Sequence, residues 1–123
     1  MARKILVIED ELSVRRLVEF IFSKNGFEVV GAGNGQEGLD LARQHNPDLI
    51  ILDLRLPIMD GVAVGKELKG DEKLRKIPVI LVTASTDNIE EKVRESLVDS
   101  YFLKPFDYQE LLKKVEELLR REL

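Results

Sequence analysis

The chain has no cysteine and no tryptophan. Without cysteine, neither disulfide bonds nor thiolate chemistry can contribute to its stability or activity. The first apolar run has only four residues before Glu9, which is too short for a signal peptide or a membrane span. We therefore expect a cytoplasmic location and no association with a membrane.

An excess of positive charge is also missing. Against 19 Lys and Arg residues stand 23 Asp and Glu, so the net charge is −4 and direct binding to nucleic acid is not expected. The 123 residues are 44% hydrophobic and 34% charged, which suits one globular domain over residues 1–123. The only histidine, His45, is expected in a loop, where it would be solvated and inert.

Five short apolar runs alternate with five segments of helical spacing. The runs are too brief for helices and suit strands buried on both faces of a sheet. The expected strands cover residues 5–8, 27–32, 49–53, 78–83 and 100–103. The expected helices cover residues 13–24, 35–44, 62–69 and 87–96, and a last helix follows a cap at Asp107. This alternation predicts an α/β fold, a parallel sheet with helices on both faces.

Capping residues mark the expected helix starts. Asn34 is the expected N-cap of the second helix, and Thr86 or Asp87 that of the fourth. Asp107 and Glu110 form a capping-box pattern, with Asp in place of Ser. The first helix should present one apolar face made of Leu17, Val18, Ile21 and Phe22. The last should present one made of Leu111, Leu112, Val115, Leu118 and Leu119.

Polar side chains follow four of the five expected strands. Glu9 and Asp10 follow the first strand, and Asp53 ends the third. Thr83 ends the fourth strand, and Lys104 follows the fifth. In doubly wound sheets, ligands bind outside the carboxyl ends of the strands, where the strand order switches. We therefore expect these side chains to share one crevice, which argues against Asp53 being a mere strand end.

The chemistry of this group indicates a phosphoryl site. Three carboxylates repel one another, and a divalent cation that prefers oxygen ligands, such as Mg²⁺, relieves that repulsion. A lysine and a threonine at the same rim supply a positive charge and a hydroxyl donor, which suit a phosphoryl group. A carboxylate beside the metal can itself act as the nucleophile and form an acyl phosphate.

Together these motifs resemble the receiver domains of bacterial two-component response regulators, and in particular the single-domain receivers of the chemotaxis-regulator type. The resemblance covers the whole chain. Its motifs are Ile8-Glu9-Asp10, Leu52-Asp53 followed by Pro57 and Met59-Asp60-Gly61, Val82-Thr83-Ala84, and Lys104-Pro105-Phe106. It implies a flavodoxin-like (βα)5 sandwich, doubly wound, with its parallel strands in the order 2-1-3-4-5.

The resemblance also implies roles for individual residues. Asp53 looks like the phosphoacceptor. The implied Mg²⁺ site consists of Asp53, Asp10 directly, Glu9 through water and the backbone carbonyl of Arg55, with Mn²⁺ as a substitute metal. The implied phosphoryl-binding and switch residues are Thr83, Ala84, Lys104 and Tyr101. Structural roles at the site fall to Pro105 (after a cis Lys-Pro bond), Asp60 and Gly61.

The implied function is a phosphorylation-activated signalling switch, not a conventional enzyme. A sensor histidine kinase, a histidine phosphotransfer protein or a small phosphodonor would phosphorylate Asp53. Thr83 would then move toward the phosphoryl oxygens, and Tyr101 would fill the vacated space. A downstream protein or a second copy would bind the altered surface of the fourth helix, fifth strand and last helix. Because no output domain follows in this sequence, we expect a stand-alone regulator or an excised receiver.

The sequence departs from the family pattern in two places. Receivers often have Gly-Ala shortly before the switch tyrosine, where this chain has Leu97-Val98. If both side chains are exposed, they add apolar area to the output surface; if both pack beneath the helix, they belong to the core. Arg55 places a long cation two residues after Asp53, at a position where the family tunes phosphorylation and hydrolysis rates.

Three other functions fit parts of the sequence. A haloacid-dehalogenase-type phosphatase would need a second Asp where this chain has Arg55. A flavodoxin-like FMN protein would need a phosphate loop rich in Ser, Thr and Gly where Glu9-Asp10-Glu11 would repel phosphate. A receiver that has lost phosphorylation and serves only as an interaction scaffold stays open.

Overall fold

The computed structural model describes residues 2–120, and strands and helices alternate through this range as the sequence predicts. The strands are β1 (Lys4–Ile8), β2 (Glu28–Ala32), β3 (Leu49–Asp53), β4 (Val79–Thr83) and β5 (Ser100–Leu103). The helices are α1 (Leu12–Lys24), α2 (Gly35–His45), α3 (Gly61–Gly70), α4 (Ile89–Ser96) and α5 (Tyr108–Arg120).

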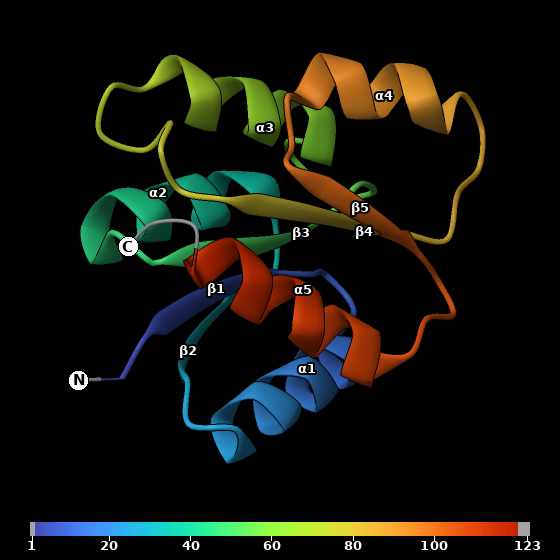
Figure 1. Cartoon of the computed structure of the whole chain (residues 1–123). Helices are drawn as coiled ribbons and strands as arrows, with labels where there is room; N and C mark the ends of the chain where they lie inside the picture. Colours follow the sequence, from blue (N-terminus) through green and yellow to red (C-terminus); the bar gives the residue numbers. More distant parts are fainter. Residues whose placement is uncertain (1, 121–123) are drawn as a thin grey trace.

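The strands form one parallel sheet in the order β2-β1-β3-β4-β5 (Figure 1). β1 pairs with both β2 and β3, so the strand order switches there. This confirms the doubly wound, flavodoxin-like fold and places β2 at an edge of the sheet, as expected. Every residue of β3 is buried, as predicted for a strand covered on both faces.

The sheet separates two hydrophobic cores (Figure 1). On one side, α2 and α3 contribute buried residues and α4 packs partly buried ones against them, among them Leu39, Val64 and Val93. On the other side, α1 and α5 pack against the sheet. All five residues of the expected apolar face of α5 are buried, because their spacing directs them to one side of the helix.

One residue assigned to the apolar face of α1 lies outside it. Val18 and Phe22 are buried and Ile21 is half-buried, but Leu17 is 47% exposed. Leu17 precedes Val18 by one position, which turns it about 100° around the helix from the buried side. The prediction for Leu17 was therefore wrong.

Two predicted caps are confirmed, and one is wrong. The Asn34 side chain accepts a hydrogen bond from the Glu37 amide at 2.8 Å, and the Asp107 carboxylate accepts one from the Gln109 amide at 2.8 Å. α4 instead begins after Asn88, which has a φ of 53° and makes no side-chain cap bond. Asn tolerates this left-handed conformation. The helix therefore begins one or two residues later than Thr86 or Asp87 as caps would place it.

His45 is the last residue of α2 and not part of a loop. It is half-buried, and its Nδ1 lies 3.4 Å from Nζ of Lys4.

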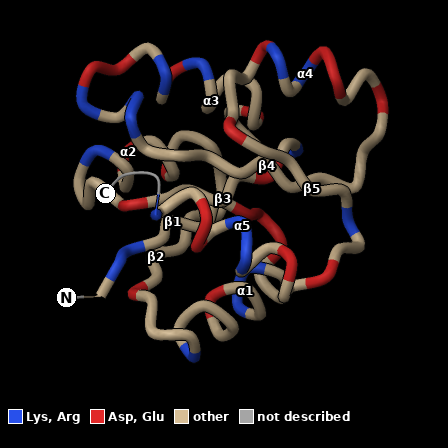
Figure 2. Tube along the Cα trace, in the orientation of Figure 1, with Lys and Arg blue, Asp and Glu red and all other residues tan. Residues whose placement is uncertain are grey.

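Charged residues are spread over the described part of the molecule, with acidic and basic residues interspersed along the helices (Figure 2). No helix within residues 2–120 is long and apolar enough to cross a membrane.

Candidate functional site

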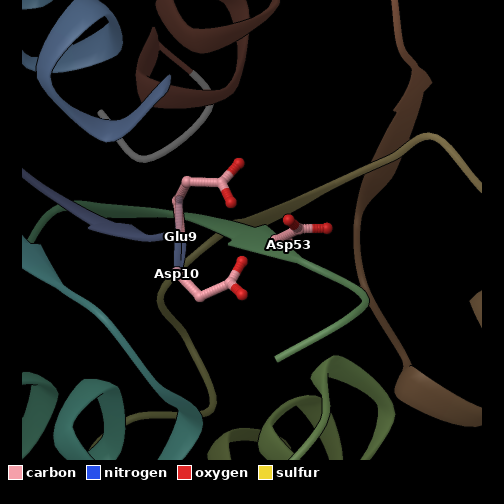
Figure 3. A group of neighbouring side chains, drawn as sticks. All are labelled: Glu9, Asp10 and Asp53. Atoms are coloured by element: carbon pink, nitrogen blue, oxygen red, sulfur yellow. The ribbon is translucent and has the colours of Figure 1, made fainter. Parts of the chain in front are cut away.

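Three carboxylates meet at the carboxyl ends of β1 and β3 (Figure 3). Glu9 and Asp10 follow β1, Asp53 ends β3, and one oxygen of each lies within 4.8 Å of the others. The pairing of Ile8 with Leu52 brings these ends side by side. Glu9 and Asp53 are only 3% and 6% exposed, whereas Asp10 is exposed. The sequence correctly predicted that these carboxylates meet.

Lys104 reaches this cluster from the end of β5. Its amide donates to the Thr83 carbonyl at 2.8 Å, which fixes the start of the following loop against β4. Its Nζ lies 2.7 Å from Oε1 of Glu9 and 3.4 Å from Oδ2 of Asp53. The Lys104-Pro105 peptide bond is cis, as the resemblance to receiver domains implies.

The surroundings of Lys104 favour its charged form. Burial by itself would lower the pKa of the ammonium. The hydrogen bond to Glu9, together with the charges of Asp53 and Glu9, outweighs that effect and raises the pKa of Lys104 above its ordinary value of 10.5. The cluster therefore has a built-in cation at neutral pH.

The loop between β3 and α3 is held close to Asp53. The Gly61 amide donates to the Leu54 carbonyl at 2.7 Å, and a Cβ at Gly61 would lie only 2.5 Å from the Asp53 carbonyl oxygen. The Asp60 side chain caps α3 by accepting from the Ala63 amide at 2.9 Å. Only glycine fits this close approach, which explains the Asp-Gly pair at the helix start.

Thr83 and Ala84 differ in exposure. Thr83 is fully buried, and its hydroxyl oxygen accepts a hydrogen bond from the Ser85 amide at 3.1 Å. Ala84 is exposed. Thr83 thus lies at the sheet edge that carries Asp53 and Lys104, with its hydroxyl already bound within its own loop.

Arg55 connects two loops at the rim of the cluster. Its amide donates to Oδ1 of Asp53 at 3.3 Å, and its guanidinium Nη2 lies 3.3 Å from Oγ of Ser85. A groove of about 430 Å³ lies beside it and is lined in part by Asp10, Asp60 and Lys92. Sequence reasoning missed Ser85 and Lys92, because neither belongs to a motif and only the fold brings them to this rim.

Tyr101 lies in β5 with 40% of its surface exposed. Leu97 and Leu103 are also exposed, at 59% and 40%. Val98, in contrast, is half-buried and packs against the core on the α2–α3–α4 side. The side chains at positions 97 and 98 therefore have different surroundings: Leu97 is on the surface, and Val98 packs against the core.

The donor set at the cluster suits a hard divalent cation. Carboxylate oxygens are the ligands that Mg²⁺ prefers, and it commonly takes one or two carboxylates while it keeps several waters. The protein therefore belongs to the class of doubly wound α/β proteins, with a ligand-binding site made of carboxylates at the switch point of its sheet.

Comparison with known proteins gives the family. Residues 5–116 match the family model described as "Response regulator receiver domain", and the chain belongs to that family. A curated relative, the polar-differentiation response regulator DivK of Brucella ovis, is 37% identical over 120 residues, covering 97% of this chain and 98% of its own. Response regulator receiver domains are generally phosphorylation-activated signalling proteins of two-component systems and not conventional enzymes.

Solved receivers are similar in structure as well. The receiver domain of sensor histidine kinase PA1611 from Pseudomonas aeruginosa, solved with a magnesium ion coordinated in its active-site cleft, has a TM-score of 0.90 and 26% identity. The alignment covers 97% of this chain and 98% of that one. TrrA from Thermotoga maritima, solved in complex with Mg²⁺ and BeF, has a TM-score of 0.85 and 32% identity over 94% of this chain and 98% of its own.

Proposed function

We propose that this chain is a signalling switch that accepts a phosphoryl group on Asp53 in a Mg²⁺-dependent reaction. One observation carries the proposal: Asp53 is buried at the switch point of the sheet, and its carboxylate lies beside those of Glu9 and Asp10 and within 3.4 Å of the Lys104 ammonium. Family membership and the Mg²⁺-bound solved receivers support it.

The metal site is proposed at the three carboxylates. Asp10 and Asp53 are the proposed direct ligands, with Glu9 acting through water and the backbone carbonyl of Arg55 as a further ligand; Mn²⁺ is the proposed substitute metal. Bound Mg²⁺ supplies positive charge that offsets the charge on the transferring phosphoryl oxygens.

Asp53 is the proposed nucleophile. One of its carboxylate oxygens forms a bond to phosphorus as the phosphorus–nitrogen bond of a donor phosphohistidine breaks, and the donor imidazole leaves with the bonding electron pair. Lys104, which contacts Asp53 through Nζ, stabilises the added negative charge. The product is an aspartyl phosphate.

The proposed readout begins at Thr83. Its hydroxyl leaves the Ser85 amide and donates to a phosphoryl oxygen, with Ala84 lining the same loop. Tyr101 then moves from its exposed position into the vacated space. Such a local charge change can remodel a distant surface, here the one formed by α4, β5 and α5.

The proposed partners are a sensor histidine kinase or a histidine phosphotransfer protein upstream, and a protein target or a second copy downstream. The exposed side chains Leu97, Tyr101 and Leu103 support the downstream proposal, since exposed apolar groups often mark binding surfaces. Residues 1–123 are proposed to act as a single receiver domain, and a cytoplasmic location stays a prediction from the sequence.

Labelling with a small phosphodonor tests the central proposal. With acetyl phosphate or phosphoramidate and Mg²⁺, the wild-type chain should gain the mass of one phosphoryl group, and Asp53→Asn should gain none. Asp60→Asn is the matched control and should be labelled like the wild type. Labelling that persists in Asp53→Asn would place the acceptor elsewhere, and an unlabelled wild type would favour the scaffold function.

Sedimentation tests the downstream surface. With beryllofluoride and Mg²⁺, we expect the wild type to self-associate or to bind its target more tightly through α4, β5 and α5. Leu97→Ala should weaken that binding without changing phosphorylation. Equal association with and without beryllofluoride would rule out a switched surface.

A further inference from the structure

The loop that carries the acidic pair is held by a residue of α1. Nη1 of Arg15 donates to the backbone carbonyl of Glu9 at 2.8 Å. On its other side, the Glu9 amide donates to the Ala32 carbonyl at 3.0 Å. The main chain of Glu9 is thus fixed from two elements, and the peptide unit that joins it to Asp10 has its orientation set by Arg15.

The path of the Arg15 side chain is itself fixed by packing. It runs across two glycines, Gly31 within β2 and Gly33 just after it. A Cβ at Gly31 would lie 3.1 Å from Cδ of Arg15, and a Cβ at Gly33 would lie 3.1 Å from Nη1 of Arg15. Arg15 also lies 3.9 Å from Glu19 through Nε, and its side chain is 21% exposed. A side chain held along its length in this way loses little freedom when it makes its hydrogen bond.

We propose that Arg15 is a positioning residue for the metal site, acting through the Glu9 carbonyl on the geometry of Glu9 and Asp10. This inference rests on the proposed function of those carboxylates. Asp10 is exposed and joined to Glu9 through the carbonyl that Arg15 holds, so a rotation of this peptide unit would move the Asp10 carboxylate away from Asp53. Partners that orient metal ligands typically change metal affinity about 10–100-fold when removed.

Because Arg15 is charged, a charge effect and a positioning effect would change the Mg²⁺ affinity in opposite directions. A cation near the acidic cluster repels Mg²⁺, so removing it would tighten Mg²⁺ binding if charge were its only effect. Positioning predicts the opposite result, weaker binding. Arg16, the next residue along α1, is exposed and carries the same charge, which makes it the matched control.

The test is calorimetric titration of the full chain with MgCl₂, together with urea unfolding in EDTA. We expect Arg15→Met and Arg15→Lys to weaken Mg²⁺ binding about tenfold. Arg16→Met should bind as the wild type does or slightly more tightly. The Lys variant keeps the charge, so its loss of affinity isolates the geometry of the hydrogen bond. Equal or tighter binding by both Arg15 variants would overturn the proposal, and lower stability in EDTA with unchanged affinity would make Arg15 a purely structural residue.

A second variant tests the same contact without touching Arg15. Gly33→Ala places a methyl group against Nη1, and should weaken Mg²⁺ binding in the wild type but have no further effect in Arg15→Met. Equal effects in both backgrounds would contradict the proposed route. Asp10→Asn separates the proposed metal site from the proposed role of Arg15. If the wild type binds no Mg²⁺, or if Asp10→Asn binds it as well as the wild type does, the proposed metal site is wrong. If the wild type binds Mg²⁺, Asp10→Asn does not and the Arg15 variants bind it normally, only the role of Arg15 is rejected.

Discussion

The ammonium of Lys104 lies 2.7 Å from Oε1 of Glu9, although 95 residues separate them along the chain. The contact is shorter than the 3.4 Å between Lys104 and Asp53. The lysine is therefore paired more closely with the acidic residue after β1 than with the proposed acceptor. Glu9 is nearly buried, so this pairing compensates a carboxylate that would otherwise be costly to keep charged.

Replacing Lys104 tests this compensation. We expect Lys104→Met to lower the free energy of unfolding in EDTA by about 1–3 kcal/mol, because it leaves buried carboxylates without their cation. The loss should be smaller than for a fully buried pair, since the lysine is 24% exposed. Mg²⁺ should recover much of it, and phosphorylation should no longer change the output surface. Urea melts with EDTA or Mg²⁺ measure the effect, with exposed Lys113→Met as the control; equal stability of both variants would show that the pairing contributes little.

Mg²⁺ should stabilise the native state, because the cluster exists only when the chain is folded. At a free concentration ten times its dissociation constant, one bound ion adds about 1.4 kcal/mol. Thermal melts should show a higher midpoint with Mg²⁺ in the wild type and little change in Asp10→Asn. Asp40→Asn on α2, whose side chain is 64% exposed, should respond like the wild type. A full Mg²⁺ response in Asp10→Asn would remove Asp10 from the ligand set.

Leu97 ends α4 in a left-handed conformation, with a φ of 60° and most of its side chain in solvent. That conformation costs a non-glycine residue about 1–2 kcal/mol, a cost that glycine does not have. Glycine also increases the conformational freedom of the unfolded chain, which offsets part of this gain in stability. Leu97→Gly should therefore raise the free energy of unfolding by about 0.5–1 kcal/mol in denaturant melts. Leu97→Ala removes the apolar side chain but keeps the strain, so it should not stabilise the fold.

Val98 should behave in the opposite way. Because it packs against the core, Val98→Ala should cost about 1–2 kcal/mol in the same melts. If Leu97→Ala and Val98→Ala destabilised the protein by similar amounts, the different surroundings found for the two residues would be wrong.

Gly65 allows α3 and α4 to lie close together. A Cβ there would lie 2.5 Å from the carbonyl oxygen and 3.0 Å from Cβ of Ser96, a buried residue. Gly65→Ala should lower the free energy of unfolding by about 1–3 kcal/mol through overpacking, in spite of the better helix propensity of alanine. Gly70→Ala is the control, since nothing lies within 4 Å of a Cβ there, and it should be neutral or slightly stabilising. Equal effects of the two substitutions would mean that the helices can separate without cost.

The sequence alone determined the order of strands and helices, the parallel sheet and the identity of the acidic cluster. Continuous apolar runs in the strands and the helical spacing of the apolar residues in α5 are local patterns of neighbouring residues. They can therefore be recognised in the sequence without knowledge of the fold. The cluster followed from the same logic, because polar groups at the ends of parallel strands must share one edge of the sheet.

What only the tertiary structure decided are relationships between residues far apart in the chain and the local turns that tertiary packing selects. The exposure of Leu17 depends on which side of α1 meets the sheet. The start of α4 after Asn88 and the different surroundings of Leu97 and Val98 depend on the backbone conformation at the two ends of that helix and on its packing against the core. The same holds for Arg15, an ordinary helix arginine in the sequence, which finds the Glu9 carbonyl only because α1 turns back along β1 and two glycines leave room for its side chain. Local sequence patterns describe which groups want burial or a partner, while the partner itself is chosen by packing across the sheet.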